Sequence, residues 1–246
     1  MLSRAVLPAL ILLSLSAPAK SQTEDLPSDP YAHTRRLNLL SAALESGYFS
    51  NSFAEDRGQK PPADFTTITG RWIVGTGGEH SRHGDHHVAQ TTSAATFCLL
   101  ERSLLVVQNF RAEVSIAGDG GNLAKAAGLY FHRPDGLQFT FVELDWKTNQ
   151  VAAYYWDGAG ERLLASAAYP LWRRGWHRLG VSVQGPRLSV TLKGRLVFSA
   201  QLPYDDEAGF MGFLTRQDSR ARFDQLVIRP DPSNRTRRQR QATTDP

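Results

Sequence analysis

The sequence predicts an all-β fold, a two-sheet antiparallel β-sandwich with a short N-terminal helix, and two observations lead to it. First, apolar residues recur at every second position in short runs, as at Leu179, Val181 and Val183. Such alternation turns one face of a strand toward a core and the other toward water or a groove. Second, turn signals such as Gly185-Pro186 separate the runs. Strands this short need a second sheet over their apolar face, so we expect two packed layers.

Residues 1–19 have the pattern of a secretory signal peptide. A basic residue, Arg4, precedes an apolar run from Ala5 to Leu15, and Ala17-Pro18-Ala19 follows as a small-x-small cleavage signal. The run is too short for a transmembrane helix, and no other run approaches the ~20 apolar residues that a span needs. We therefore expect no transmembrane segment and a secreted or periplasmic location.

Residues 20–50 are predicted to form a polar linker followed by a short helix. Leu37, Leu40 and Leu44 recur at helical spacing within the segment 34–46, and Thr34 is suited to cap its N-terminus. We expect this helix to dock on the sandwich or to lead into it.

Residues 51–230 are predicted to form the sandwich itself, with about a dozen strands. The five strands of 176–228 are expected to form one β-meander. The strands expected before it are 71–74, 87–91, 95–100, 104–110, 110–116, 127–132, 139–145, 151–156 and 162–168. Cys98 is the only cysteine, so no internal disulfide can form, and we expect it to be buried.

Residues 231–246 are predicted to be a disordered basic tail, because they hold four arginines and almost nothing apolar. The formal net charge is +4, of which Arg4 contributes one and the tail two. The body of the protein is therefore near neutral, and we expect no nucleic-acid partner. The sequence carries no signal for an oligomeric state.

Four stretches of the chain carry a family resemblance. They are AAGLYFHRPDGLQFTFVELDWKTNQVAAYYWDGAGERLL, GWHRLGVSVQG, LKGRLVF and AGFMGFLTRQDSRARFDQLVI. Together they resemble the concanavalin A-like, or laminin-G-like, jelly rolls of secreted bacterial proteins. The named relatives are 3-keto-disaccharide hydrolase domains and domains labelled family 16 glycoside hydrolase. The resemblance covers about residues 53–228 and implies the fold more specifically than an activity, since its motif residues are mostly turns and core.

The segment 139–147 holds the first candidate site. If Val142 and Leu144 face the core, then Phe141, Glu143 and Asp145 share the other face, which we expect to be the concave face of the sandwich. Residues two apart on a strand lie ~6.6 Å apart, within the range of glycosidase carboxylate pairs. Glu143 and Asp145 are therefore candidate catalytic residues.

The resemblance to family 16 glycoside hydrolases implies Glu-x-Asp followed by a second Glu that acts as the acid/base. Glu143-Leu144-Asp145 matches the first half, but the next positions are Trp146, Lys147 and Thr148. Without that proton donor the family's mechanism fails. The alternative is that Glu143 and Asp145 accept hydrogen bonds from sugar hydroxyls or pair with Arg133 and Lys147.

Sugar binding also needs aromatic faces that stack on a pyranose beside polar groups. Tyr154 and Trp156 lie on one face of their strand and Tyr155 on the other, but the pattern does not decide which face is exposed. For any one ring taken singly, a place in the core is the commoner interpretation. The candidate ligand-binding residues are Arg133, Trp146, Lys147, Tyr154 and Trp156.

Two candidate metal sites remain open. His80, His83 and His86 lie close together in sequence and could hold zinc or copper, or they form a solvated polar loop. The resemblance to carbohydrate-binding jelly rolls implies that Asp224 could help to hold a structural calcium, with further oxygens from Glu55, Asp56 or Asp119. Alternatively, Asp224 bonds backbone amides at a strand edge. Beyond these metals the sequence predicts no cofactor.

Three functions follow from these observations. The leading hypothesis is a secreted carbohydrate-binding domain that recognises a glycan on its concave sheet. The second is a glycoside hydrolase of the 3-keto-disaccharide hydrolase type, as the resemblance implies. The third is a laminin-G-like adhesion or structural domain that binds protein partners.

Overall fold

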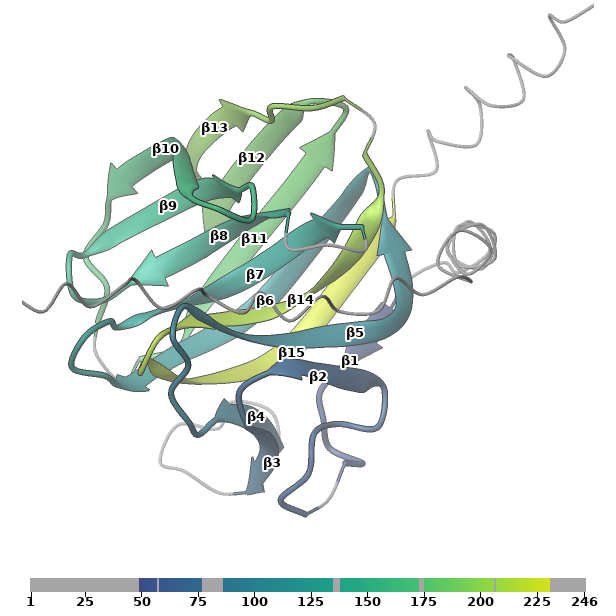
Figure 1. The fold of residues 1–246 in the computed structure, drawn as a ribbon, viewed down its shortest axis with the longest axis vertical. Coiled ribbons are helices and arrows are strands. Elements are labelled where there is room, and N and C mark those ends of the chain that lie inside the picture. Colours follow the sequence, from purple (N-terminus) through teal and green to yellow (C-terminus); the bar gives the residue numbers. More distant parts are fainter. Residues whose placement is uncertain are drawn as a thin grey trace, which may run out of the picture.

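The computed structural model describes residues 49–56, 58–76, 86–134, 138–172, 175–205 and 207–230. Within these ranges the chain folds as 15 antiparallel strands in two sheets that pack face to face (Figure 1). The predicted all-β sandwich is confirmed. The signal-like segment, the helix expected at 34–46 and the basic tail lie outside the described residues. No helix in the described ranges has the length and hydropathy to cross a membrane.

Seven of the described strands form the sheet that faces the viewer in Figure 1. In spatial order they are β10 (Glu161–Ala168), β9 (Gln150–Trp156), β8 (Phe139–Asp145), β7 (Ala126–Arg133), β14 (Gly209–Arg216), β5 (Phe97–Val107) and β2 (Phe65–Thr69).

The other eight described strands form the second sheet. In spatial order they are β13 (Arg195–Gln201), β12 (Arg187–Leu192), β11 (His177–Gln184), β6 (Phe110–Gly120), β15 (Arg220–Pro230), β4 (His86–Gln90) and β3 (Trp72–Thr76), with β1 (Phe49–Asn51) paired to β15.

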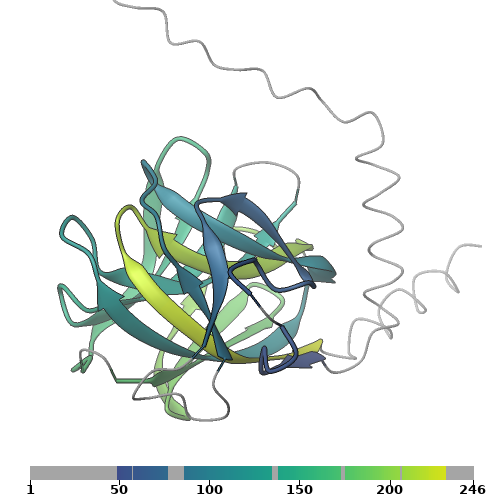
Figure 2. The same ribbon diagram turned by 90° about the horizontal axis from the view of Figure 1, so that it is seen from below.

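The expected β-meander at 176–228 is not a single sheet. Strands β11, β12 and β13 are neighbours in the eight-stranded sheet, but β14 pairs with β7 and β5 in the other sheet, and β15 returns to the first. Figure 2 shows these yellow-green C-terminal strands beside blue and teal strands from the first half of the chain. Alternation assigns the faces of a strand but not its neighbours, so the pattern could not reveal this crossing.

The core lies between the two sheets and is rich in phenylalanine. Phe213 of β14 stacks on Phe223 of β15 with ring centroids 4.5 Å apart, and Phe131 of β7 meets Phe110 of β6 edge-on at 5.3 Å. Each such side chain contributes roughly 1.5–3 kcal/mol when it is fully buried. Cys98 is buried in the same cluster, as predicted, so apolar packing holds the two layers together without a disulfide.

Candidate functional site

The outer face of the seven-stranded sheet carries an aromatic layer. Along β8, Val142 and Leu144 belong to the core between the sheets, whereas Phe139 and Phe141 belong to a separate cluster on the opposite face, as the alternation predicted. The other members of this outer layer are Phe97, Leu99, Tyr130 and Leu214, with Tyr154 and Trp156 packed against them.

Tyr154 and Trp156 share one face of β9, as the sequence predicts, and the structure shows that this face is the outer one. Tyr154 stacks on Phe141 with ring centroids 5.2 Å apart, and Trp156 meets Phe97 edge-on at 5.3 Å. Tyr155 points away from this layer and contacts Tyr204.

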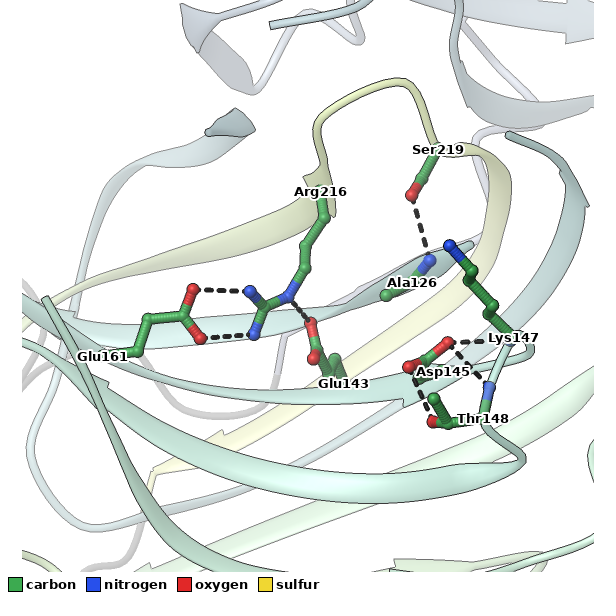
Figure 3. A network of polar contacts seen from close by, with 8 residues as sticks. All are labelled: Ala126, Glu143, Asp145, Lys147, Thr148, Glu161, Arg216 and Ser219. Atoms are coloured by element: carbon green, nitrogen blue, oxygen red, sulfur yellow. Dashed lines mark hydrogen bonds and ion pairs between the residues drawn. The ribbon is translucent and has the colours of Figure 1, made fainter. Parts of the chain in front are cut away.

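Arg216, the last residue of β14, is the centre of a charged network on this face (Figure 3). Its Nε donates to Oε2 of Glu143 at 2.6 Å. Its two terminal nitrogens donate to both carboxylate oxygens of Glu161, at 2.6 and 2.8 Å. One guanidinium therefore joins a carboxylate in the middle of the sheet to a carboxylate on the edge strand β10.

Aromatic rings surround this guanidinium. The Cζ atom of Arg216 lies 5.0, 5.1 and 5.6 Å from the ring centroids of Tyr154, Phe141 and Phe97, distances that allow cation–π attraction. Burial alone would lower the pKa of Arg216, but its hydrogen bonds to Glu161 and Glu143 outweigh burial and raise that pKa. Arg216 therefore stays charged, and its charge is matched by carboxylates.

Glu143 is the most buried carboxylate of the network. Burial raises the pKa of Glu143 to about 7, although the hydrogen bond and charge of Arg216 act in the opposite direction. A carboxyl group with such a pKa can hold or release a proton near neutral pH. Chemically, Glu143 can act either as a hydrogen-bond acceptor or as a general acid.

This network borders an open hollow with a volume of about 320 Å³. The hollow is lined by residues of five strands (β7, β8, β9, β10 and β14) and of four connecting segments. The lining residues are Thr96, Leu123, Ala124, Lys125, Ala126, Glu143, Asp145, Lys147, Tyr154, Glu161, Arg216 and Gln217.

Hydrogen bonds from the β14–β15 turn hold one rim of the hollow in place. The carboxylate of Asp218 accepts backbone N–H groups from Asn122, Leu123 and Ala124 at 2.7, 3.0 and 3.0 Å. Ser219 Oγ accepts the N–H of Ala126 at 3.0 Å (Figure 3). The rim is therefore fastened to the same turn that follows Arg216.

Both carboxylates predicted from the Glu-x-Asp pattern line the hollow, but they have different surroundings. Glu143 binds Arg216, whereas Asp145 accepts the N–H groups of Lys147 and Thr148 and the Thr148 hydroxyl, and so it caps the turn after β8. Lys147 Nζ donates to the carbonyl of Leu123 at 3.0 Å. Among the described residues, Lys147 therefore forms no ion pair with Glu143 or Asp145, although the sequence analysis expected one.

Arg133 was also expected to pair with these carboxylates, and that expectation is wrong. Its guanidinium binds Glu101 of β5 at 2.6 Å, and Glu101 also accepts the hydroxyl of Tyr130 at 3.2 Å. Arg133 is not among the residues that line the hollow. Arg133 and Glu143 lie on different parts of the sheet, so each takes a different partner.

Trp146 is not available for stacking on a sugar, contrary to the sequence prediction. Its side chain belongs to the core and is 4% exposed. Strand β8 ends at Asp145, but Trp146 continues its alternation, because it falls on the same side as Val142 and Leu144 and joins them in the core. The ring packs over Gly118, where a Cβ atom would come within 2.7 Å of it, and beside His177.

Arg216 and Glu161 are the site residues that the sequence analysis missed. Arg216 could have been found by continuing the alternation of Phe210, Gly212 and Leu214 by one more step, which places it on the outer face. Glu161 opens the strand after the turn at Asp157-Gly158, and only the register of β9 with β10, in which Glu161 pairs with Trp156, places it beside the hollow.

The described residues contain no group of three His, Cys, Asp or Glu side chains placed to hold a metal ion. His86 begins β4, while His80 and His83 lie outside the described residues. The calcium hypothesis finds no support in the described part either. Asp224 is buried and accepts the backbone N–H of Gln225, as in the alternative prediction, although β15 lies between β6 and β4 and is not an edge strand. Asp119 forms a bidentate pair with Arg222.

Comparison with known proteins identifies the fold of this chain but no family. The chain matches no protein-family model and no curated protein sequence. Among solved structures, it is similar to the carbohydrate-binding module CBM66 from Bacillus subtilis, with a TM-score of 0.57 and 20% identity, over 68% of this chain and 95% of that one. The fold is a concanavalin A-like jelly roll.

Two further structures share this jelly roll. A protein of unknown function with a galectin-like fold from Bacillus subtilis has a TM-score of 0.54 and 11% identity, over 75% of this chain and 96% of that one. A β-glucanase of Bacillus licheniformis has a TM-score of 0.51 and 12% identity, over 76% of this chain and 99% of that one. Identities this low show the jelly roll alone, so function has to be argued from the site.

Proposed function

We propose that this protein is a carbohydrate-binding jelly roll that holds a sugar in the hollow around Arg216. The observation that carries the proposal is the combination of a guanidinium, the carboxylates of Glu143 and Glu161, and the ring of Tyr154 in one hollow. Sugar hydroxyls donate to carboxylates and accept from guanidinium groups, while aromatic rings cover the apolar face of a pyranose.

The size of the hollow and the similar structures support this class of ligand. A volume of about 320 Å³ lies at the small end of ligand sites, which suits one or two sugar units. The similar structures include a protein named as a carbohydrate-binding module and another named as a β-glucanase. The same fold can carry unrelated functions, so this support is secondary to the site.

Affinity electrophoresis in polysaccharide-containing gels, followed by calorimetric titration with oligosaccharides, tests the proposal. Tyr154→Ala should weaken binding about tenfold, because losing ~1.4 kcal/mol of ring contact has that effect. Trp172→Ala is the matched control, since Trp172 is 72% exposed and is not among the residues that line the hollow. Retention on no glycan would refute the proposal, and crosslinking that captures only a protein partner would favour an adhesion domain.

A second candidate function is glycoside hydrolysis with Glu143 as the general acid. It is favoured by the burial that raises the pKa of Glu143 to about 7, which suits a proton donor at neutral pH. The partner carboxylate would be Asp145, two residues along the same strand face. The assay is release of reducing sugar from glycosides and 3-keto-glycosides. Glu143→Gln should abolish turnover but retain binding. Absence of turnover in the unmodified protein would refute the hydrolase function, and carbohydrate binding would remain as the proposed function.

We also infer that the protein is exported, because residues 1–19 have the pattern of a signal peptide. Expression of the full chain in a host with a secretory pathway should yield a mature protein that begins just after Ala19. An intact N-terminus on a cytoplasmic product would contradict this inference.

A further inference from the structure

The two carboxylates that bind Arg216 differ in how exposed they are to water. The side chain of Glu143 is 4% exposed and lies in the middle of the sheet. The side chain of Glu161 is 29% exposed, yet it takes both terminal nitrogens of the guanidinium. The two terminal nitrogens together are best suited to bind a planar carboxylate, and Glu161, the more exposed partner, occupies both of them (Figure 3).

Glu161 belongs to a part of the sheet that can release it at low cost. It is the first residue of β10, which lies at the edge of the seven-stranded sheet. The Asp157 turn before it is held by its own hydrogen bonds to the N–H groups of Ala159 and Gly160, so the turn does not depend on Glu161. The side chain of Glu161 is 29% exposed, so water can solvate its carboxylate once it leaves Arg216, and this offsets part of the loss of the bidentate pair.

The charged side chains that line the hollow would have a net charge of +1 once Glu161 turned away, with three cations against Glu143 and Asp145. Lys125 and Lys147 line it together with Arg216, and neither lysine forms an ion pair in the part of the chain that the structure describes. Asp145 is occupied by the turn that it caps. Glu143 would then be the one carboxylate left on Arg216 among the residues lining the hollow.

We propose that the hollow binds the carboxylate of an acidic glycan, a polymer or oligosaccharide that carries uronic acid residues, and that this carboxylate takes the place of Glu161 on Arg216. The ligand group has the same shape and charge as the group that it replaces, so the bidentate geometry is preserved. Lys125 and Lys147 would attract the anionic chain at the rim. This inference rests on the proposed carbohydrate-binding function and narrows its ligand class.

The test is calorimetric titration of the full chain with oligosaccharides from polygalacturonate, alginate and hyaluronan, each beside its carboxyl-reduced, neutral counterpart. Binding of at least one acidic form is expected, with at least a tenfold loss on carboxyl reduction. Glu161→Gln should bind the acidic form about threefold to fivefold more tightly, because the internal competitor is removed. Arg216→Lys should bind it at least tenfold more weakly, because lysine cannot make the bidentate contact.

Glu113→Gln is the matched control for Glu161→Gln. Glu113 also forms a partly exposed ion pair, with Arg178, but it lies on β6 of the other sheet. This substitution changes the net charge by the same amount and should leave the affinity unchanged. If both substitutions tighten binding equally, the effect is general electrostatics and the proposed exchange is refuted. Dextran sulfate that binds as tightly as the uronates, with no response to Glu161→Gln, would also refute it.

Failure of this inference can be separated from failure of the proposed function. Binding of neutral glycans that is unaffected by carboxyl reduction, or that is weakened in Glu161→Gln, would overturn the acidic-ligand inference and leave carbohydrate binding in place. Binding of none of the acidic or neutral glycans would overturn both. Should Arg216→Lys fail to fold, the comparison of Glu161→Gln with Glu113→Gln still decides the question.

Discussion

Replacing Arg216 with methionine should destabilise the protein strongly at alkaline pH. The substitution keeps an unbranched side chain over the aromatic layer but removes the hydrogen bond to Glu143, which is 2.6 Å long. The carboxylate of Glu143 would then be a buried charge without its partner, because its side chain is only 4% exposed. Breaking a buried pair in this way costs about 3–5 kcal/mol. We expect a loss of that size at pH 8.

The cost should be smaller at low pH, and its sign follows from the pKa of Glu143. Burial raises that pKa from 4.5 to about 7 in the intact protein, and the loss of Arg216 would raise it further. A group with a raised folded-state pKa contributes stability that is fully present below its unfolded pKa and is lost as pH rises through its folded pKa. Below about pH 4.5 Glu143 is neutral in Arg216→Met, and the remaining cost, about 1–2 kcal/mol, comes from the lost ring contacts and the lost hydrogen bonds to Glu161.

Urea denaturation followed by tryptophan fluorescence between pH 4 and 8 measures this difference. The double variant Arg216→Met, Glu143→Gln removes both charges and should recover at least about 2 kcal/mol at pH 8 relative to Arg216→Met alone. Glu161→Gln, which breaks the more exposed pair, should cost no more than about 1 kcal/mol. A loss in Arg216→Met that does not change with pH, and that Glu143→Gln does not relieve, would refute the argument.

Three further predictions concern packing and pH, with the free energy of unfolding in urea as the measurement. Trp146→Ala should cost about 3–5 kcal/mol, as for a buried aromatic, while Trp172→Ala should stay within about 0.5 kcal/mol; equal effects would mean that Trp146 is not in the core. Gly128→Ala should cost about 3 kcal/mol, because its Cβ would overlap the carbonyl oxygen of Val142 on β8; an unchanged midpoint would contradict that close approach. Burial lowers the pKa of His132 to about 4, so the stability that neutral His132 contributes is present above pH 6.5 and is lost as pH falls toward 4. Over this range the free energy of unfolding of His132→Gln should fall by about 3 kcal/mol less than that of the unmodified protein. Parallel pH curves for the two proteins would contradict this prediction.

The sequence predicted the faces of the strands well. The alternation along β8 put Val142 in the core and Phe141 and Glu143 outside, and the structure agrees. The same alternation places Trp146 with Val142 and Leu144 in the core, where the structure has it, so its choice as a sugar-binding residue went against the pattern. The strand boundaries were predicted less well, because the strands expected at 95–100 and 104–110 are one continuous strand, β5 (Phe97–Val107), with Phe110 opening β6.

The partners of the site residues were beyond the reach of sequence reasoning. Glu143 was expected to pair with Arg133, which is near in sequence, but it pairs with Arg216, 73 residues away. That contact exists because β14 leaves the strands that precede it and inserts between β7 and β5. Nothing in the local pattern of β14 distinguishes this position from a place beside β13.

By itself, then, the amino-acid sequence determined the fold class, the two faces of most strands and the outward position of Glu143. These features depend on the period of the side chains along a strand, which is a local property that any one segment carries. Only the tertiary structure decided that Arg216 joins Glu143 to Glu161 over an aromatic layer. Such a site depends on which distant strands pair and in what register, and that choice is made by the packing of the whole sandwich.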